Sequence, residues 1–373
     1  MAGGAEVVIV GGGIIGLAIA REAARAGMRV VLLERGTPGC EASSAAAGIL
    51  SAQLEAEASD PLLSLCLASR DLYPEFARRV ASESGLDPRL MDHGTMVVAR
   101  GPEAARRLER QYAFQRAAGL PADLLDRDGA RRREGSLAES VEAALFLPRD
   151  TSIDNALLVR ALAAAAAKAG ARLRDGVSAS RLVVESGRVA GIEAGGERLA
   201  AGAVVIAAGA WTGSIAGEGI PSLPSHPVRG QMIALASPVP RHIVVDDACY
   251  LVPRHDGRVL VGSTMERVGF DKGVTAEAVA ALTSAAIALV PNLRAAVFRE
   301  AWAGLRPATD DGLPAIGPGP APGLFYACGH LRNGILLAPI TARLVVALLR
   351  GEAPAIDLTP FDPRRFARGP SAS

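Results

Sequence analysis

The stretch from Val7 to Glu34, VVIVGGGIIGLAIAREAARAGMRVVLLE, constrains the fold of this chain more than any other. It begins with a short apolar run, which predicts a buried parallel strand. The small apolar residues that follow have helical spacing as far as Ala26, and Gly27 ends the predicted helix. A second apolar run at 29–33 predicts another strand. A strand, a glycine turn, a helix and a strand in this order are typical of a nucleotide-binding β-α-β unit.

The glycines of the turn have the spacing G-x-G-x-x-G, and each has a separate geometric task. Gly11 permits the tight turn, Gly13 lets the backbone approach a pyrophosphate, and Gly16 lets the helix pack closely on the strand. The amides at the start of the helix favour an anion there. Glu34 ends the second strand, where an acid binds ribose hydroxyls and disfavours the 2′-phosphate of NADP. A glycine loop without a ligand is the alternative, but the complete unit favours a bound dinucleotide. NAD and FAD would fit such a unit equally well.

The composition limits the partners and the compartment that we expect. The chain has 373 residues, half of them hydrophobic, so two domains or one large core can form. A net charge of +1 gives no reason to expect nucleic acid or an anionic membrane surface as a partner. Cys40, Cys66, Cys249 and Cys328 are scattered without metal-ligand spacing, so we expect reduced thiols, no metal and a cytoplasmic protein. No apolar run approaches the roughly 20 residues of a membrane span, and we expect neither membrane insertion nor a signal peptide.

Two later segments offer further places for a ligand. SSAAAGIL at 43–50 combines hydroxyl and small side chains, which suit a backbone pressed against a ligand. An ordinary serine cap on an alanine-rich helix is the alternative explanation of that segment. A buried strand at 204–207 leads into Gly209, where the backbone could again approach a cofactor.

The order of the predicted elements indicates an α/β protein with a discontinuous dinucleotide domain. We expect that domain to comprise residues 1–87, 143–222 and 306–373. Alternating strands within 223–305 predict an antiparallel sheet, and this segment with the insertion at 88–142 should make a second domain built on that sheet. A ligand site is then expected where the two domains meet.

The same pattern gives three local expectations. The apolar strand at 143–147 should return the chain to the first sheet, as the start of the second piece of the cofactor domain. The proline-rich tail at 352–373 should fray. The run Arg131–Arg133 should be a solvated face rather than a phosphate site.

Three segments give the chain a specific resemblance. SSAAAGIL at 43–50, AGLRPATDDGLPAIGP at 303–318 and GHLRNGILLAP at 329–339 resemble the FAD-dependent amino acid oxidases of the D-amino acid oxidase superfamily. The resemblance is closest to the glycine oxidases of the thiamine pathway and covers nearly the whole chain. It implies an α/β fold in which a Rossmann-type, glutathione reductase-like FAD-binding domain is interleaved with an antiparallel-sheet substrate domain.

The resemblance also implies an activity. We expect oxidation of glycine or another small amine-bearing acid by O2 to the oxoacid, ammonia and hydrogen peroxide, with thiamine synthesis as a possible purpose. A sarcosine oxidase, or a D-amino acid oxidase or dehydrogenase that reduces a quinone, is the alternative within this class. A non-catalytic or tRNA-modifying flavoprotein is a more distant one, which the lack of a basic cluster disfavours. A homo-oligomer is expected by the same resemblance.

Arg306 is the residue that we expect to anchor the substrate. Arginine binds a carboxylate bidentately, and this arginine ends an apolar strand. A structural ion pair with Asp310 or Asp311 is the alternative. By resemblance Arg306 is the carboxylate-binding arginine and Arg332 is a second arginine at the active site. The resemblance adds two further residues of the active site: Tyr250, whose hydroxyl reaches the substrate unless it is an ordinary strand tyrosine, and Met265, which lines the pocket.

The remaining expectations concern FAD. The amides before the last helix should stabilise negative charge at N1 and O2 of the reduced flavin. No general base is needed if the amine binds neutral, because hydride can then leave Cα directly. The expected FAD contacts are Gly11, Gly13, Ile14, Ile15, Gly16, Glu34, Arg35, Ala42, Ser43, Ser44, Ala47, Gly48, Ile49, Val177, His330, Leu331, Arg332, Asn333, Gly334, Ile335 and Leu336.

Two departures from related patterns refine these expectations. Sarcosine oxidases attach their flavin through a cysteine near the strand end that here reads Gly304-Leu305-Arg306, and they use a lysine near oxygen. The matching strand at 259–262 has no lysine, and no cysteine lies near Arg306, so we expect non-covalent FAD. Ala248 stands where glycine oxidases carry a polar residue, which leaves the substrate preference open.

Overall fold

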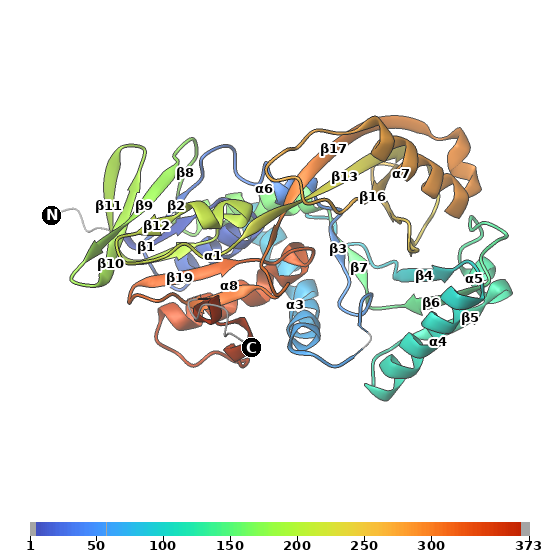
Figure 1. Ribbon diagram of the computed structural model, residues 1–373, viewed down its shortest axis with the longest axis horizontal. Coiled ribbons are helices and arrows are strands. Elements are labelled where there is room, and N and C mark those ends of the chain that lie inside the picture. Colours follow the sequence, from blue (N-terminus) through green and yellow to red (C-terminus); the bar gives the residue numbers. More distant parts are fainter. Residues whose placement is uncertain (1–4, 57, 367–373) are drawn as a thin grey trace.

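The computed structural model of the chain describes residues 5–56 and 58–366. Within them, the strands form a nine-stranded sheet, an eight-stranded sheet and a two-stranded pair of β3 (Ile49–Leu50) with β7 (Thr151–Ser152). Figure 1 shows the nine-stranded sheet on the left and the eight-stranded sheet on the right, with long strands running between the two halves. The expected α/β class is confirmed, and both parallel and antiparallel pairing occur.

The first sheet has a parallel centre. Its glycine-turn strand β1 pairs in parallel with β2 on one side and with β11 on the other, and β8 and β19 extend these pairs. An antiparallel meander leads out from β11 through β10 and β9. The strands are β1 (Ala5–Val10), β2 (Val30–Leu33), β8 (Arg172–Arg174), β9 (Ala179–Glu185), β10 (Arg188–Ala194), β11 (Glu197–Ile206), β12 (Ala216–Gly217), β18 (Ala315–Pro318) and β19 (Leu324–Cys328).

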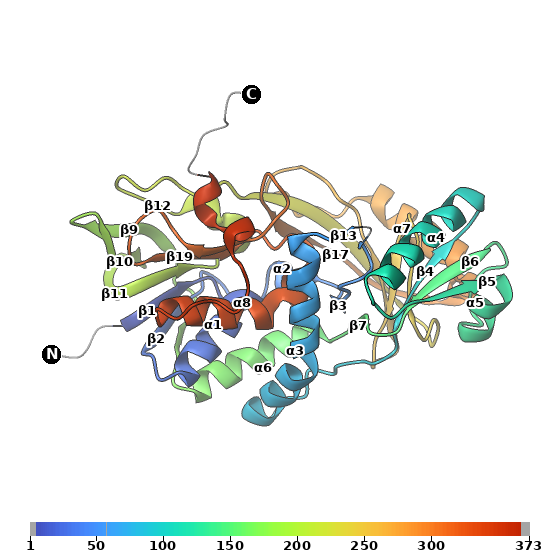
Figure 2. The same cartoon turned by 90° about the horizontal axis from the view of Figure 1, so that it is seen from below.

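Four helices cover one side of this sheet and make its core. They are α1 (Ile14–Arg25), α3 (Pro61–Ser84), α6 (Asn155–Lys168) and α8 (Gly334–Leu349). Figure 2 shows α1, α8 and α6 gathered on one side of the sheet, with α3 beside them. Their small residues permit this close packing, because almost every residue of α1 is buried. The caps follow from the sequence: Asp60 accepts a hydrogen bond from the amide of Leu63 at 2.6 Å, and α3 ends at the left-handed Gly85.

The second sheet is mostly antiparallel. Its order is β17-β13-β16-β15-β14-β4-β6-β5, and helices α4, α5 and α7 accompany it. The strands are β4 (Thr95–Ala99), β5 (Asp123–Asp126), β6 (Ala143–Leu147), β13 (His226–Ala236), β14 (Ile243–Val245), β15 (Tyr250–Pro253), β16 (Arg258–Gly262) and β17 (Val297–Ala308), and the helices are α4 (Pro102–Ala117), α5 (Arg127–Arg133) and α7 (Ala276–Leu289).

The strand at 143–147 differs from expectation. β6 pairs with β4 and β5 in the second sheet, whereas the sequence pattern placed it in the first. A strand of five apolar residues looks the same whichever sheet buries it, so its pattern could not decide this. The domain division at 142/143 and 305/306 stays a prediction, and the second of these points falls inside β17.

The tail also differs from expectation over its described part. Residues 359–361 and 363–366 form short 3-10 turns, and Phe361 is 1% exposed within the core of the first domain. One large aromatic ring outweighs the surrounding prolines, since its burial is favourable by a few kcal/mol. The rest of the predicted fraying, at 367–373, lies outside the described residues.

Candidate active site

A cavity of about 940 Å³ lies where the two sheets meet. The carboxyl ends of the parallel strands β1, β2, β11 and β19 open into it, which is where open α/β sheets bind ligands. From there it continues to residues of the second sheet, including Arg306 and Tyr250. Its size and its lining from both domains suit a dinucleotide with a small second ligand.

The glycine turn forms the first wall of this cavity. Gly11 has φ +111°, and a Cβ there would lie 2.3 Å from the carbonyl oxygen of Ala207. A Cβ on Gly16 would lie 1.9 Å from the carbonyl oxygen of Gly11. At Gly13 the only atom near a Cβ would be the hydroxyl oxygen of Ser43 at 3.2 Å, so the backbone faces the cavity. The turn therefore leaves room for a ligand on one side and none on the other.

Glu34 is held by the chain itself. Its carboxylate accepts hydrogen bonds from the amides of Gly12 at 2.7 Å and Gly36 at 2.9 Å. It lines the cavity at the end of β2 in a fixed orientation. Beyond it, the guanidinium of Arg35 stacks 3.7 Å from the ring centroid of Trp211. Val177, which also lines the cavity, donates its amide to the carbonyl of Glu34 at 2.9 Å. These residues belong to the first sheet's side of the cavity, whereas Arg306 belongs to β17 of the second sheet.

The SSAAAGIL segment is anchored from behind. Ser43 accepts a hydrogen bond from the amide of Ile14 at 2.9 Å, so a side chain from this segment caps the first turn of α1. The carbonyls of Ser43 and Ser44 accept from the side-chain amide of Asn155 at 2.7 and 3.0 Å, and Arg254 donates to that same side chain. The short helix α2 (Ala42–Ala45) begins after Glu41 without a side-chain cap, so the explanation as a serine cap on this helix is wrong. Ala47 and Ile49 line the cavity, and their contact with a ligand stays a prediction.

Asn155 and Arg254 are functional supports that the sequence did not reveal. Asn155 is 1% exposed and follows the helix cap Asp154, so it looks like an ordinary first-turn residue. Arg254 follows β15 in the second sheet and also donates to the carbonyl of Ile153 at 2.8 Å. Only the tertiary contact connects them with the segment at 43–50, which we call the cofactor loop.

Arg306 lies on β17 at the other end of the cavity. It donates hydrogen bonds to the hydroxyl of Ser263 at 2.5 Å and to the carbonyl of Thr264 at 3.2 Å. Within the described residues it has no carboxylate partner, because Asp310 pairs with His226 and Asp311 pairs with Arg365. The ion-pair alternative is therefore absent from this structure. Burial removes water from the guanidinium and lowers the pKa of Arg306. An anionic ligand beside it would stabilise its positive charge.

Two features hold Arg306 and its surroundings in place. A Cβ on Gly230 of β13 would lie 2.2 Å from a guanidinium nitrogen, so this glycine gives the side chain its space. Earlier on β17, the indole nitrogen of Trp302 donates to the carbonyl of Ala45 at 2.9 Å, and Gly304 faces the same residue. The strand that carries Arg306 is thus bonded directly to the cofactor loop.

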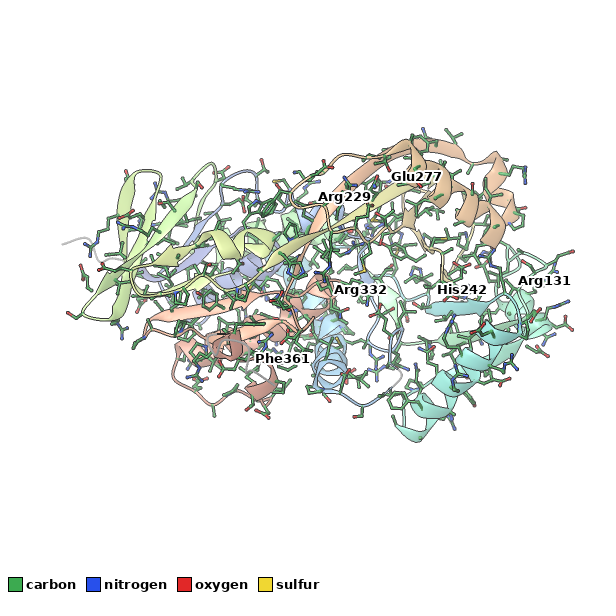
Figure 3. The ribbon with its side chains drawn as sticks, in the orientation of Figure 1. Arg131, Arg229, His242, Glu277, Arg332 and Phe361 are labelled. Carbon is green, nitrogen blue, oxygen red and sulfur yellow. The ribbon has the colours of Figure 1, made fainter. Side chains whose placement is uncertain are left out.

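Tyr250, Met265 and Arg332 surround this end of the cavity. The hydroxyl of Tyr250 lies 3.5 Å from the sulfur of Met232, and Met265 is 54% exposed. Arg332 is half exposed and forms an ion pair with Glu55 at 2.6 Å. Figure 3 shows it in the middle of the molecule, between the two halves. Its charge is already partnered, unlike that of Arg306.

The start of α8 completes this region. Gly334 and Ile335 line the cavity, and no side-chain hydrogen bond caps this helix within the described chain. Its first amides are therefore available to a negative charge. His330 is buried, and its Nε2 lies 3.1 Å from the hydroxyl of Thr341. Burial lowers the pKa of His330 to about 3, so its ring is neutral.

Most of the residues expected to contact FAD line the cavity, and three do not. Gly16 packs against the carbonyl of Gly11, Ser44 is exposed, and Leu336 is in the core, where its carbonyl accepts from Ser69 at 2.6 Å. The expected residues that do line it are Gly11, Gly13, Ile14, Ile15, Glu34, Arg35, Ala42, Ser43, Ala47, Gly48, Ile49, Val177, His330, Leu331, Arg332, Asn333, Gly334 and Ile335.

Three cysteines also line the cavity. Burial raises the pKa of Cys66, Cys249 and Cys328 to about 12, so these thiols are protonated at neutral pH. The described part of the chain groups no three His, Cys, Asp or Glu side chains as a metal site. Within residues 5–56 and 58–366, each helix is too short or too polar to span a bilayer.

A nucleotide-binding α/β domain that shares one cavity with an arginine-bearing antiparallel sheet defines a class of dinucleotide-dependent oxidoreductases. The chain belongs to the DAO family of FAD-dependent oxidoreductases, whose model matches residues 6–348. It is 41% identical over 362 residues to a glycine oxidase from Geobacillus kaustophilus, covering 95% of this chain and 96% of the relative. The crystal structure of glycine oxidase from Geobacillus kaustophilus has a TM-score of 0.93, covering 97% of this chain and 98% of that chain. A bifunctional protein ThiO/ThiG from Trichormus variabilis is 35% identical, covering 99% of this chain and 56% of the relative.

Proposed function

We propose that this protein oxidises glycine, or another small amine-bearing acid, with O2. The observation that carries the proposal is Arg306, a partly buried cation at the cavity without a carboxylate partner in the described chain. A cavity with one uncompensated guanidinium favours a ligand with a carboxylate. The names of the relatives, glycine oxidase and ThiO/ThiG, support glycine as substrate and thiamine synthesis as the purpose.

The residues of the glycine turn, Glu34 and the 43–50 segment would hold the adenine, ribose and pyrophosphate part of FAD. Their backbone leaves an open cradle at Gly13, where a Cβ would meet only the hydroxyl of Ser43 at 3.2 Å and would otherwise project into the cavity. The start of α8 would lie toward the other end of the cofactor. When bound, FAD supplies a two-electron acceptor for the hydride that leaves the substrate Cα.

The residues of the chain orient the amino acid. Arg306 would bind the carboxylate, since its fork matches two carboxylate oxygens. Tyr250 would place its hydroxyl against the substrate from the neighbouring strand. The free amides at the start of α8 would stabilise negative charge at this end of the cavity. No residue has to remove a proton from Cα if the amine binds in its neutral form.

The overall reaction balances without another reductant. Glycine, O2 and water give glyoxylate, ammonia and hydrogen peroxide. The C–N single bond is oxidised to an imine, water adds to the imine carbon, and ammonia leaves. O2 takes up the two electrons and becomes peroxide.

We also propose that the flavin is bound non-covalently. A cysteine must be a thiolate to attack the flavin, and the pKa values of the three cysteines of the cavity are raised by burial. Acid precipitation of the purified yellow protein should release its colour into the supernatant. Colour that stays with the pellet would contradict this proposal.

The substrate is tested by anaerobic addition of glycine, sarcosine and D-alanine. Glycine should bleach the flavin absorbance, and air should restore it with release of peroxide. Faster bleaching by sarcosine or D-alanine would favour the alternative within the class. No bleaching by any of the three would remove the amino acid oxidase proposal. Recovery with a soluble quinone but not with air would assign a dehydrogenase.

A further inference from the structure

Helix α4 carries polar side chains on the side that faces the cavity. Arg107, Gln111 and Gln115 are four residues apart, so they form one stripe along the helix. Gln111 is 6% exposed and Gln115 is fully buried. Buried carboxamides need partners, and theirs lie outside the helix.

One set of partners is the loop at 51–56, which lines the cavity. The side-chain amide of Gln111 donates to the carbonyl of Leu54 at 2.8 Å. Gln115 donates to the carbonyl of Gln53 at 2.9 Å, and the buried side chain of Gln53 donates back to Gln115 at 2.7 Å. Two side chains of α4 therefore fix the backbone position of this loop.

The opposite side of the loop is fixed as well. Asp150, which is fully buried, accepts from the amides of Ala52 at 3.2 Å and Gln53 at 2.9 Å and pairs with Arg70 at 3.0 Å. Burial raises the pKa of Asp150, and the pairing with Arg70 opposes that effect. The loop is thus held between α4 and a buried ion pair, and it presents Glu55 to Arg332 at 2.6 Å.

The other partner of α4 is the turn at 246–249, which lines the same cavity. Arg107 donates to both carboxylate oxygens of Asp247 at 2.6 and 2.7 Å. Inside the turn, Asp246 accepts from the amides of Ala248 at 2.9 Å and Cys249 at 3.0 Å. The loop and the turn come from distant parts of the chain, and α4 is bonded to both.

We propose that α4 sets the size of carboxylate ligand that fits beside Arg306, with Gln111 and Gln115 as positioning residues. Gln111 lines the cavity, but in this proposal Gln111 and Gln115 act by holding the carbonyls of Leu54 and Gln53, and Arg107 acts by holding Asp247 of the turn. The proposal rests on the proposed function, because it takes the amino acid to bind at the end of the cavity that these walls enclose. Freeing one wall should admit larger acids without weakening the anchor for small ones.

The test measures binding of two inert acids, acetate and benzoate, to the holoenzyme by the change in flavin absorbance. Gln111→Met keeps the side-chain length and removes the hydrogen bond to Leu54. We expect the ratio of the benzoate Kd to the acetate Kd to fall by about fivefold, the equivalent of one ordinary hydrogen bond. Arg110→Met, on the exposed side of α4, is the matched control and should keep the wild-type ratio and Tm.

Arg107→Met removes the ion pair with Asp247 and so releases the turn at 246–249. It is the variant to measure if Gln111→Met does not fold. It should lower the ratio in the same direction but by less, because half-exposed ion pairs are weak. A ratio that stays within the scatter of Arg110→Met, even with a lower Tm, would make α4 a purely structural helix. If the wild-type protein binds acetate but glycine does not reduce its flavin, the proposed function is wrong. The comparison of benzoate and acetate binding between variants then still tests the role of α4. Failure of the wild type to bind acetate would overturn both.

Discussion

The cofactor end of the cavity is made mostly of backbone, whereas the amino acid end is made of side chains. At the first, Gly11 and Gly13 and the amides around them form a surface on which a missing Cβ is the important feature. At the second, Arg306, Tyr250 and the Arg332–Glu55 pair project from separate strands and loops. The first end recognises a shape that many enzymes share, and the second selects what is oxidised.

This difference explains why the cofactor end can be predicted from a sequence motif and the amino acid end cannot. A backbone cradle needs glycines at fixed spacing in a single segment, so it leaves a contiguous motif. A side-chain site draws residues from distant segments, and α4 with its loop and turn leaves no such motif. Changes at the two ends should accordingly have different consequences.

The largest effect is expected from Gly16→Ala. The new Cβ would lie 1.9 Å from the carbonyl oxygen of Gly11, so the turn must shift. We expect flavin affinity to fall by roughly a hundredfold or more, measured as flavin absorbance per mole of purified protein. Gly27→Ala, with φ +86° but nothing within 4 Å, should keep its flavin. Normal flavin content in Gly16→Ala would show that the cradle is not the determinant of this end.

Arg306→Ala should act on the other end alone. Loss of a charge-assisted bidentate bond should raise the KM for the amino acid by at least about tenfold while flavin content stays normal. Arg332→Ala is the comparison, and its effect should be smaller because Glu55 already pairs with this arginine. An unchanged KM in steady-state kinetics would mean that Arg306 has a structural role. A loss of flavin from Arg306→Ala would mean that this residue affects cofactor binding as well as substrate binding.

The last comparison concerns the acid stability of the second sheet, away from both ends of the cavity. Burial alone would raise the pKa of Glu134, but hydrogen bonds from His242, Ser136 and two backbone amides lower it to about 2. A depressed carboxyl pKa stabilises the fold above the ordinary value near 4.5 and loses that contribution as pH falls toward 2.

Glu134→Gln should therefore cost roughly 2 kcal/mol at neutral pH, and the difference from wild type should shrink below the ordinary carboxyl pKa. Thermal unfolding across this pH range measures it. Glu139→Gln, at a side chain that is 91% exposed, should show no such trend. If the difference in unfolding free energy between the variant and the wild type is the same at all pH values, the negative charge of Glu134 does not stabilise the fold.

The sequence predicted the fold class and family through local patterns. The β-α-β unit and the motif around Arg306 depend on neighbouring residues, and the structure and the family match agree with the fold class and family that they indicate. It could not place β6, since a fully apolar strand fits either sheet. It missed the burial of Phe361 because a single aromatic among prolines has no periodicity.

The candidate site divides in the same way. Spacing pointed to Gly11, Gly13 and Glu34, and the resemblance pointed to Arg306 and the α8 turn. Neither could show that Asp310 and Asp311 have other partners, which leaves Arg306 without a carboxylate among the residues that the structure describes. Nor could they find Asn155, Arg254 or Gln111, whose polar partners are distant in sequence and close only in the fold.

Strand β17 links the two ends through Trp302, Gly304 and Arg306. Side chains alternate along a strand, so these residues share one face: the first bonds to Ala45, the second gives that residue room, and the third reaches the amino acid end. A single inserted or deleted residue between Trp302 and Arg306 would turn the guanidinium to the opposite face. Evolution can therefore lengthen or shorten many loops of such a protein, but this stretch should keep a constant length wherever the same chemistry is retained.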